Sequence, residues 1–111
     1  AVAISSVFLG ALAAQAGLPV VVSSALETSV GISMGLSLAS LIPELDYDCG
    51  LATAALLAAD VTDEPLTPVD GSLTVRRVTP GSALLDRHAA SADRTAWWLD
   101  RLTRCYGLLG A

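Results

Sequence analysis

The sequence predicts an α/β fold in which short buried strands alternate with helices. Residues 18–24 read Leu-Pro-Val-Val-Val-Ser-Ser, and such a continuous apolar run is typical of a parallel strand covered on both faces. Helical patterns lie on both sides of this run, as right-handed βαβ units require. The 111 residues are 53% apolar and 15% charged, so the composition favours one buried core and excludes a disordered chain.

The first half predicts two strand–helix units. Residues 3–16, rich in Ala and Leu, predict a helix that precedes the strand at 18–24. Large and small residues then alternate, a strand pattern when taken alone. The segment runs about 13 residues to Pro43, however, which is long for a strand and favours a helix capped by Thr28 and Ser29. On that helix a bulky ridge forms from Val30, Met34, Leu38 and Leu41. A second short strand is expected at 49–53 and a helix at 54–59.

The second half has a different texture. Residues 61–71 are rich in Pro, Thr and Asp, and 69–72 (Val-Asp-Gly-Ser) predict a turn. A short strand is expected at 73–78. Thr79-Pro80 can open a helix to about His88, and Asp93 can cap a last amphipathic helix to about Leu109. We therefore expect two parts, residues 1–60 and residues 61–111.

The charge distribution limits the classes of partner. All six Arg and the single His lie in residues 76–111, whereas residues 1–75 carry acidic side chains and no basic one. The formal net charge of −5 disfavours a nucleic-acid partner, because phosphates need a basic face. Gly17 and Pro19 interrupt the uncharged N-terminal stretch before it reaches the length of a membrane span, so no membrane partner is expected. The two cysteines, which form no metal-binding pair, fit a reducing and therefore cytoplasmic location.

The carboxyl ends of the two predicted strands are the candidate binding site. Ser23, Ser24 and Glu27 follow the first strand, and Gly50 and Leu51 lie at the second. Ligands of α/β sheets bind at this edge, where hydroxyls and the free N–H groups of a helix start suit a carboxylate. Plain helix capping is the competing interpretation of the same residues.

The remaining polar groups favour a structural interpretation. Two clusters of acids are expected to be solvated loops rather than metal sites, namely Glu44, Asp46 and Asp48, and Asp60, Asp63 and Glu64. Cys49 and Cys105 are too few for a disulfide framework. The chain contains no Lys, and we find no nucleophile elbow, phosphate loop or zinc motif. The residues themselves thus predict no catalytic group.

Four stretches carry a resemblance to a known family. They are 19–31 (Pro-Val-Val-Val-Ser-Ser-Ala-Leu-Glu-Thr-Ser-Val-Gly), 47–53 (Tyr-Asp-Cys-Gly-Leu-Ala-Thr), 68–71 (Pro-Val-Asp-Gly) and 97–101 (Trp-Trp-Leu-Asp-Arg). With them the chain resembles the C-terminal part of actinobacterial o-succinylbenzoate synthases, of the enolase superfamily. The resemblance implies the last two βα units of a modified TIM barrel, with a C-terminal helical tail that returns toward a capping domain.

The resemblance also implies a reaction. These lyases of menaquinone biosynthesis dehydrate 2-succinyl-6-hydroxy-2,4-cyclohexadiene-1-carboxylate to o-succinylbenzoate, using Mg²⁺ held by three carboxylates and a pair of lysines. Neither lysine nor the metal carboxylates match residues of this chain, which we therefore expect to be inactive alone. What carries over is substrate binding, by Ser23, Ser24 and Glu27 and by Gly50 and Leu51.

Two other functions stay open. Another enolase-superfamily activity, such as N-acylamino-acid racemisation, differs little in this part of the pocket. A non-catalytic piece would instead assemble with a partner or with itself through its unpaired strands. In each case the predicted strands need further strands or self-association to be covered.

Overall fold

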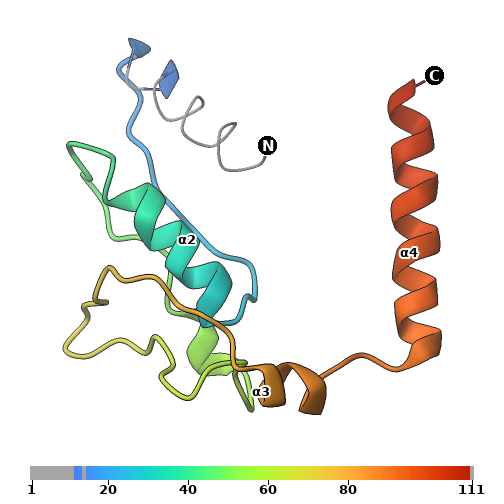
Figure 1. The fold of residues 1–111 in the computed structure, drawn as a ribbon. Coiled ribbons are helices and arrows are strands. Elements are labelled where there is room, and N and C mark those ends of the chain that lie inside the picture. Colours follow the sequence, from blue (N-terminus) through green and yellow to red (C-terminus); the bar gives the residue numbers. More distant parts are fainter. Residues whose placement is uncertain (1–11, 14, 111) are drawn as a thin grey trace.

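The computed structural model describes residues 12–13 and 15–110. Its elements are helix α2 (Ser29–Ala39), the 3₁₀ turn η1 (Thr53–Leu56), helices α3 (Ser82–Arg87) and α4 (Ala92–Gly107), and the 3₁₀ turn η2 (Leu108–Gly110) (Figure 1). Most of the helix predicted at 3–16 lies outside the described residues. Three other predicted helices are present as α2, α3 and α4. The helix expected at 54–59 is replaced by the short turn η1.

Helix α2 is the centre of the core. It begins after Thr28 and ends at Ala39, before Pro43, so the helical interpretation of this segment is confirmed. The expected cap is not, because the Thr28 side chain makes no capping hydrogen bond. The buried side chains of the helix are Ser29, Ile32, Ser33, Leu36 and Ala39. Two residues of the ridge described above lie outside the core, since Met34 is 62% exposed and Leu41, beyond the end of the helix, is 67% exposed. The buried side of the helix packs against core side chains from segments distant in the sequence, such as Leu51 and Leu66.

The core joins α2 to the two halves of the chain. Its buried apolar residues are Val22, Ile32, Leu36, Ala39, Leu51, Ala54, Leu66 and Val78. Leu51 packs closely against α2 at Gly35, where an added Cβ would lie 2.7 Å from Leu51 Cδ2. Gly35 therefore lets the chain after Gly50 approach the helix.

The two predicted strands lie side by side and parallel, but they pair at a single point. Ser23 and Gly50 form an isolated parallel bridge, and no longer ladder occurs within 15–110. Val22 is buried, whereas Val21 beside it is 50% exposed. The expected burial on both faces is thus not reached, because a parallel strand needs a neighbour on each edge and a layer on each face.

The second half follows its predicted turn and then departs from the prediction. Val69 and Ser72 exchange backbone hydrogen bonds of 2.9 Å, with positive φ at Asp70 and Gly71, so the turn is confirmed. Residues 73–78 form no strand. Helix α4 is capped by Ser91, whose side chain accepts from the Arg94 N–H, and not by Asp93 as expected.

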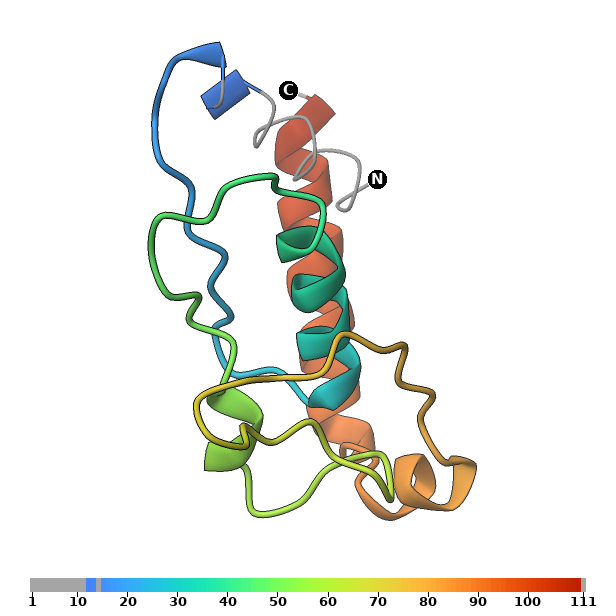
Figure 2. The same ribbon diagram turned by 90° about the vertical axis from the view of Figure 1, so that its left-hand side faces the viewer.

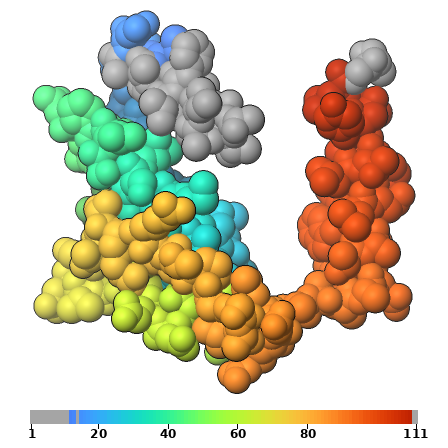
Figure 3. Space-filling model, viewed as in Figure 1, coloured from blue at the N-terminus to red at the C-terminus, as the bar shows by residue number. Residues whose placement is uncertain are grey.

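Helix α4 stands apart from the rest of the described chain in Figure 1, and in the turned view of Figure 2 it runs behind α2. Among the named elements it contacts only η2, which continues it, and the space-filling view shows it as a separate column (Figure 3). Its large apolar side chains are accordingly open to solvent, Trp98 at 52% and Leu102 at 65%. The helix is held by local interactions, including the Asp100–Arg104 ion pair at 3.0 Å.

The packing of α2 yields a stability test. Ile32 is completely buried, so Ile32→Ala should lower the free energy of unfolding by about 2–5 kcal/mol through lost contacts and a cavity. Met34→Ala on the exposed side of the same helix should change it by less than about 0.5 kcal/mol. Urea unfolding followed by far-UV circular dichroism measures both. Equal losses would contradict the observed orientation of α2.

Candidate functional site

The site expected from the sequence centres on the bridge between Ser23 and Gly50. Two backbone hydrogen bonds of 2.9 Å close it, from the Gly50 N–H to Val22 O and from the Ser24 N–H to Gly50 O. The structure thus brings the two predicted strand ends together, although they are 26 residues apart in sequence. Both backbone groups of Gly50 are used by the bridge, so Gly50 has no amide left to donate to a ligand.

The hydroxyl of Ser24 is committed to the protein. Ser24 Oγ donates to Gly50 O at 2.9 Å and lies 2.7 Å from Thr53 Oγ1. A serine hydroxyl has one proton, so when it is given to Gly50 O, the Thr53 hydroxyl is the donor of the second bond. Ser24 therefore ties the first predicted strand to the start of η1.

The hydroxyl of Ser23 is differently placed. The residue is exposed, and its Oγ makes only a long bond of 3.4 Å to its neighbour Ser24 O. Gly50 makes room for this side chain, because a Cβ on residue 50 would lie 2.7 Å from Ser23 Oγ. Of the two serines, Ser23 presents the hydroxyl that a ligand can engage.

Glu27 lies against the first turn of α2. A Cβ on Gly31 would come within 2.6 Å of Glu27 Cβ, so the glycine gives the Glu27 side chain its place. Glu27 Oε2 is buried and has no hydrogen-bond partner among the described residues. A buried carboxylate oxygen without a donor is costly. Among the described residues, Glu27 Oε2 is therefore a polar atom that the protein leaves without a donor.

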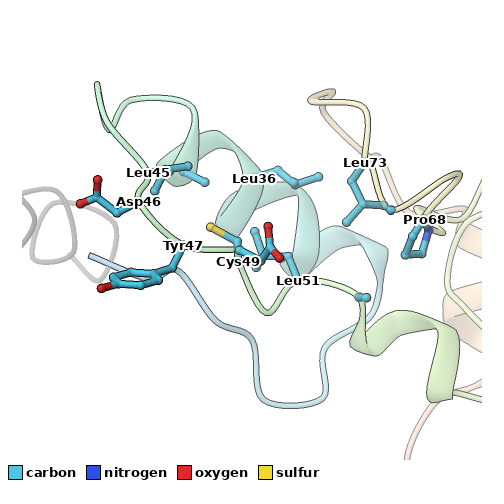
Figure 4. A pocket seen from close by; sticks show the side chains of 12 residues that line it. Leu36, Leu45, Asp46, Tyr47, Cys49, Leu51, Pro68 and Leu73 are labelled. Atoms are coloured by element: carbon cyan, nitrogen blue, oxygen red, sulfur yellow. The ribbon is translucent and has the colours of Figure 1, made fainter. Parts of the chain in front are cut away.

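The Leu51 side chain lies in the core, away from the serines. Its side chain is 3% exposed and contributes to a broad open hollow between α2 and residues 45–52 and 68–73 (Figure 4). That hollow is lined mainly by apolar side chains, among them Leu36, Leu45 and Leu73, with Asp46 and Asp48 beside them. Ser23, Ser24, Glu27 and Gly50 are not part of its lining. The predicted site residues thus lie in two places. Ser23, Ser24, Glu27 and Gly50 lie at or near the parallel bridge, which we call the bridge edge, and Leu51 lies in the core.

The start of α2 holds a carboxylate of the protein itself. The Ser29 N–H donates to both carboxylate oxygens of Asp60, at 3.2 and 3.0 Å. The expectation of free N–H groups there is wrong at Ser29, and the expectation that Asp60 belongs to a solvated loop is also wrong. No local pattern marks this contact, because the partners are 31 residues apart.

Other expected groups stay apart. Within the described part of the chain, no three His, Cys, Asp or Glu side chains gather closely enough to hold a metal ion. Glu44, Asp46 and Asp48 are exposed, as a solvated loop predicts. Both cysteines are free, Cys105 exposed and Cys49 partly buried. Among the described helices none has the length and apolar character to cross a bilayer.

Comparison with characterised proteins bears on the resemblance stated above. The chain is similar to o-succinylbenzoate synthase of Mycobacterium leprae, 54% identical over 99 residues that are 89% of this chain and 29% of that protein. It is 51% identical to the synthase of Mycobacterium bovis BCG and 50% identical to that of Mycobacterium ulcerans, in each case over 98 residues that make up 88% of this chain and 30% of the relative. No family model matches the chain.

The chain thus spans less than a third of the length of these relatives. Identity of half or more over almost the whole chain is far beyond chance similarity. The 111 residues are homologous to a part, about 30%, of the mycobacterial o-succinylbenzoate synthases.

Proposed function

We propose that these residues act as part of an o-succinylbenzoate synthase. The whole enzyme is a carbon–oxygen lyase that forms o-succinylbenzoate from 2-succinyl-6-hydroxy-2,4-cyclohexadiene-1-carboxylate in the cytoplasmic synthesis of menaquinone. The observation that carries the proposal is the similarity of 50–54% to relatives of that name. The pairing of Ser23 with Gly50 supports it, since it places two predicted strand ends side by side in the parallel arrangement that a barrel needs.

Within that enzyme the bridge edge would bind a carboxylate of the substrate. Ser23 offers a solvent-facing hydroxyl, and Gly50 leaves the space in which that hydroxyl lies. A hydroxyl that donates to a carboxylate forms a charge-assisted bond, which is stronger than a neutral one. Ser24 would hold this edge in place through its hydrogen bonds to Gly50 and Thr53. Leu51 would support the edge from below, from its place in the core.

The chemistry itself would come from elsewhere in the enzyme. The family reaction uses Mg²⁺ and lysines, whereas this chain has no Lys and its described residues place no three metal ligands together. The magnesium site therefore does not fit the residues described, and no step through the metal is derived from them. The role proposed for this chain is to orient the substrate and to close the barrel.

Uncovered apolar surface supports a place in a larger fold. Val21, Trp98 and Leu102 are each at least half exposed, and Glu27 Oε2 is buried with no donor among the described residues. In the proposed enzyme, neighbouring strands would cover Val21 and supply the missing donor. The tail with α4, in residues 61–111, would pack its apolar side on the capping domain. Self-association through the same surfaces is the alternative assembly.

The proposed carboxylate contact can be tested at Ser23. In the intact protein, Ser23→Ala should raise KM about 10- to 100-fold, because a hydrogen bond to a charged group contributes about 1.5–3 kcal/mol. Gly50→Ala should raise KM as well, since the added Cβ would displace Ser23 Oγ. Steady-state kinetics of dehydration measure both. An unchanged KM in both variants would remove the contact.

Substitution of Ser24 should affect the stability of the protein, whereas substitution of Ser23 should affect substrate binding. Ser24→Ala loses the bonds to Gly50 O and Thr53 Oγ1, so the free energy of unfolding should fall by about 1 kcal/mol or more. Ser23→Ala is the matched control and should leave stability within about 0.5 kcal/mol of the parent. Chemical unfolding of the two variants provides the comparison. A stability loss at Ser23 instead of Ser24 would reverse the roles assigned to the two hydroxyls.

The proposal that these residues bind substrate while the rest of the enzyme performs the chemistry can be tested with the 111 residues alone. Supplied with Mg²⁺ and substrate, they should show no dehydration, because the lysines and metal carboxylates of the family reaction are missing. The intact protein should dehydrate the cyclohexadiene substrate much faster than it racemises an N-acylamino acid. Turnover by the 111 residues would disprove the first expectation, and faster racemisation would favour the alternative enzyme.

A further inference from the structure

Outside the predicted site, the Asp60 carboxylate accepts more hydrogen bonds than any other side chain of the described residues. It lies in the loop after η1 and is partly buried. One carboxylate oxygen accepts from the Ser29 hydroxyl at 2.5 Å, and both accept from the Ser29 N–H. The Val61 N–H donates to Oδ1 at 2.7 Å. The carboxylate therefore binds the first residue of α2 and its own loop at the same time.

Ser29 extends this contact to a third segment. The residue is completely buried, and its Oγ accepts from the Leu66 N–H at 2.7 Å while it donates to Asp60. The loop is held further by the Gly81 N–H, which donates to Val61 O at 2.8 Å. The start of α2 is thus fixed by polar bonds to residues 60–66, and bonds to a charged acceptor are the strongest of their kind.

This junction lies close in sequence to the bridge edge. Ser23 and Ser24 are held on one side by Gly50 and Thr53, and the chain then reaches Ser29 within five residues. The short segment 25–28 therefore connects the start of α2 directly to the residues that present the Ser23 hydroxyl. The negative charge of Asp60 also occupies the positive end of the helix, where a substrate carboxylate would otherwise be attracted.

We propose that Asp60 is a positioning residue for the carboxylate site at Ser23. It acts through Ser29, holding α2 so that the Ser23 hydroxyl faces the substrate. This inference rests on the proposed function, because it concerns the same bridge edge.

The test uses Asp60→Asn in the intact protein. Asn keeps the shape but has a single acceptor oxygen. If that oxygen keeps the N–H bonds of Ser29 and Val61, the NH₂ group faces the Ser29 hydroxyl and cannot accept from it. KM should rise roughly tenfold while kcat changes by less than about threefold, since misplacement of a binding group costs substrate orientation. A merely structural role would lower the active fraction, which reduces apparent kcat and leaves KM unchanged. Asp63→Asn, an exposed carboxylate in the same loop, is the matched control.

Coupling to Ser23 separates positioning from general damage. If Asp60 acts through Ser23, the double variant Ser23→Ala/Asp60→Asn should have the KM of Ser23→Ala alone, because the two changes remove one contact. Multiplied effects on KM would overturn the proposal, as would an unchanged KM in Asp60→Asn. Ser29→Ala should reproduce the rise in KM if the parent tolerates it, and no rise in a folded Ser29→Ala protein would also overturn it.

A measurement without turnover distinguishes this inference from the proposed function. Amide hydrogen exchange of the intact protein should be faster at residues 23–31 in Asp60→Asn than in Asp63→Asn. An inactive parent with this exchange difference would refute the proposed reaction and leave the link from Asp60 to the 23–31 segment in place. Equal exchange in the two variants would refute the link, whatever the parent catalyses.

Discussion

The parallel bridge between Ser23 and Gly50 is the constraint on which the rest of the structure depends. Two backbone hydrogen bonds and the Ser24 hydroxyl join segments that are 26 residues apart. With that junction closed, α2 lies between the two segments, and Val22, Ile32 and Leu51 meet in one core. The long connection through α2 gives the bridge its entropic cost, and burial of these side chains offsets that cost.

The same bridge explains why the structure is open. A lone parallel pair cannot cover both of its faces, and here Val21 is left half exposed. Helix α4 is open for a related reason, since it is stable through local bonds yet finds no apolar partner in the described chain. Both features agree with a chain homologous to about 30% of a larger enzyme.

Prediction from the sequence succeeded where the signal is local. Thr28 and Ser29 before an apolar run marked the start of α2, and the Asp70-Gly71 pair marked the turn at 69–72. The Asp100–Arg104 ion pair is local in the same sense, because its members are four residues apart on one helix. Prediction failed where a distant partner decides. The segment 73–78 was expected to form a strand, but none of the described residues pairs with it in a ladder.

The candidate site shows the same division. By itself, the sequence determined which residue types gather at the strand ends, because helix capping and strand propensity act within a few residues. Only the tertiary structure decided that Ser24 is tied to Gly50 and Thr53, that Ser23 is left to face solvent, and that Asp60 occupies the start of α2. Hydrogen bonds between residues some 30 positions apart leave no periodic trace in a sequence. They form only when the burial of a shared core brings their donors and acceptors together.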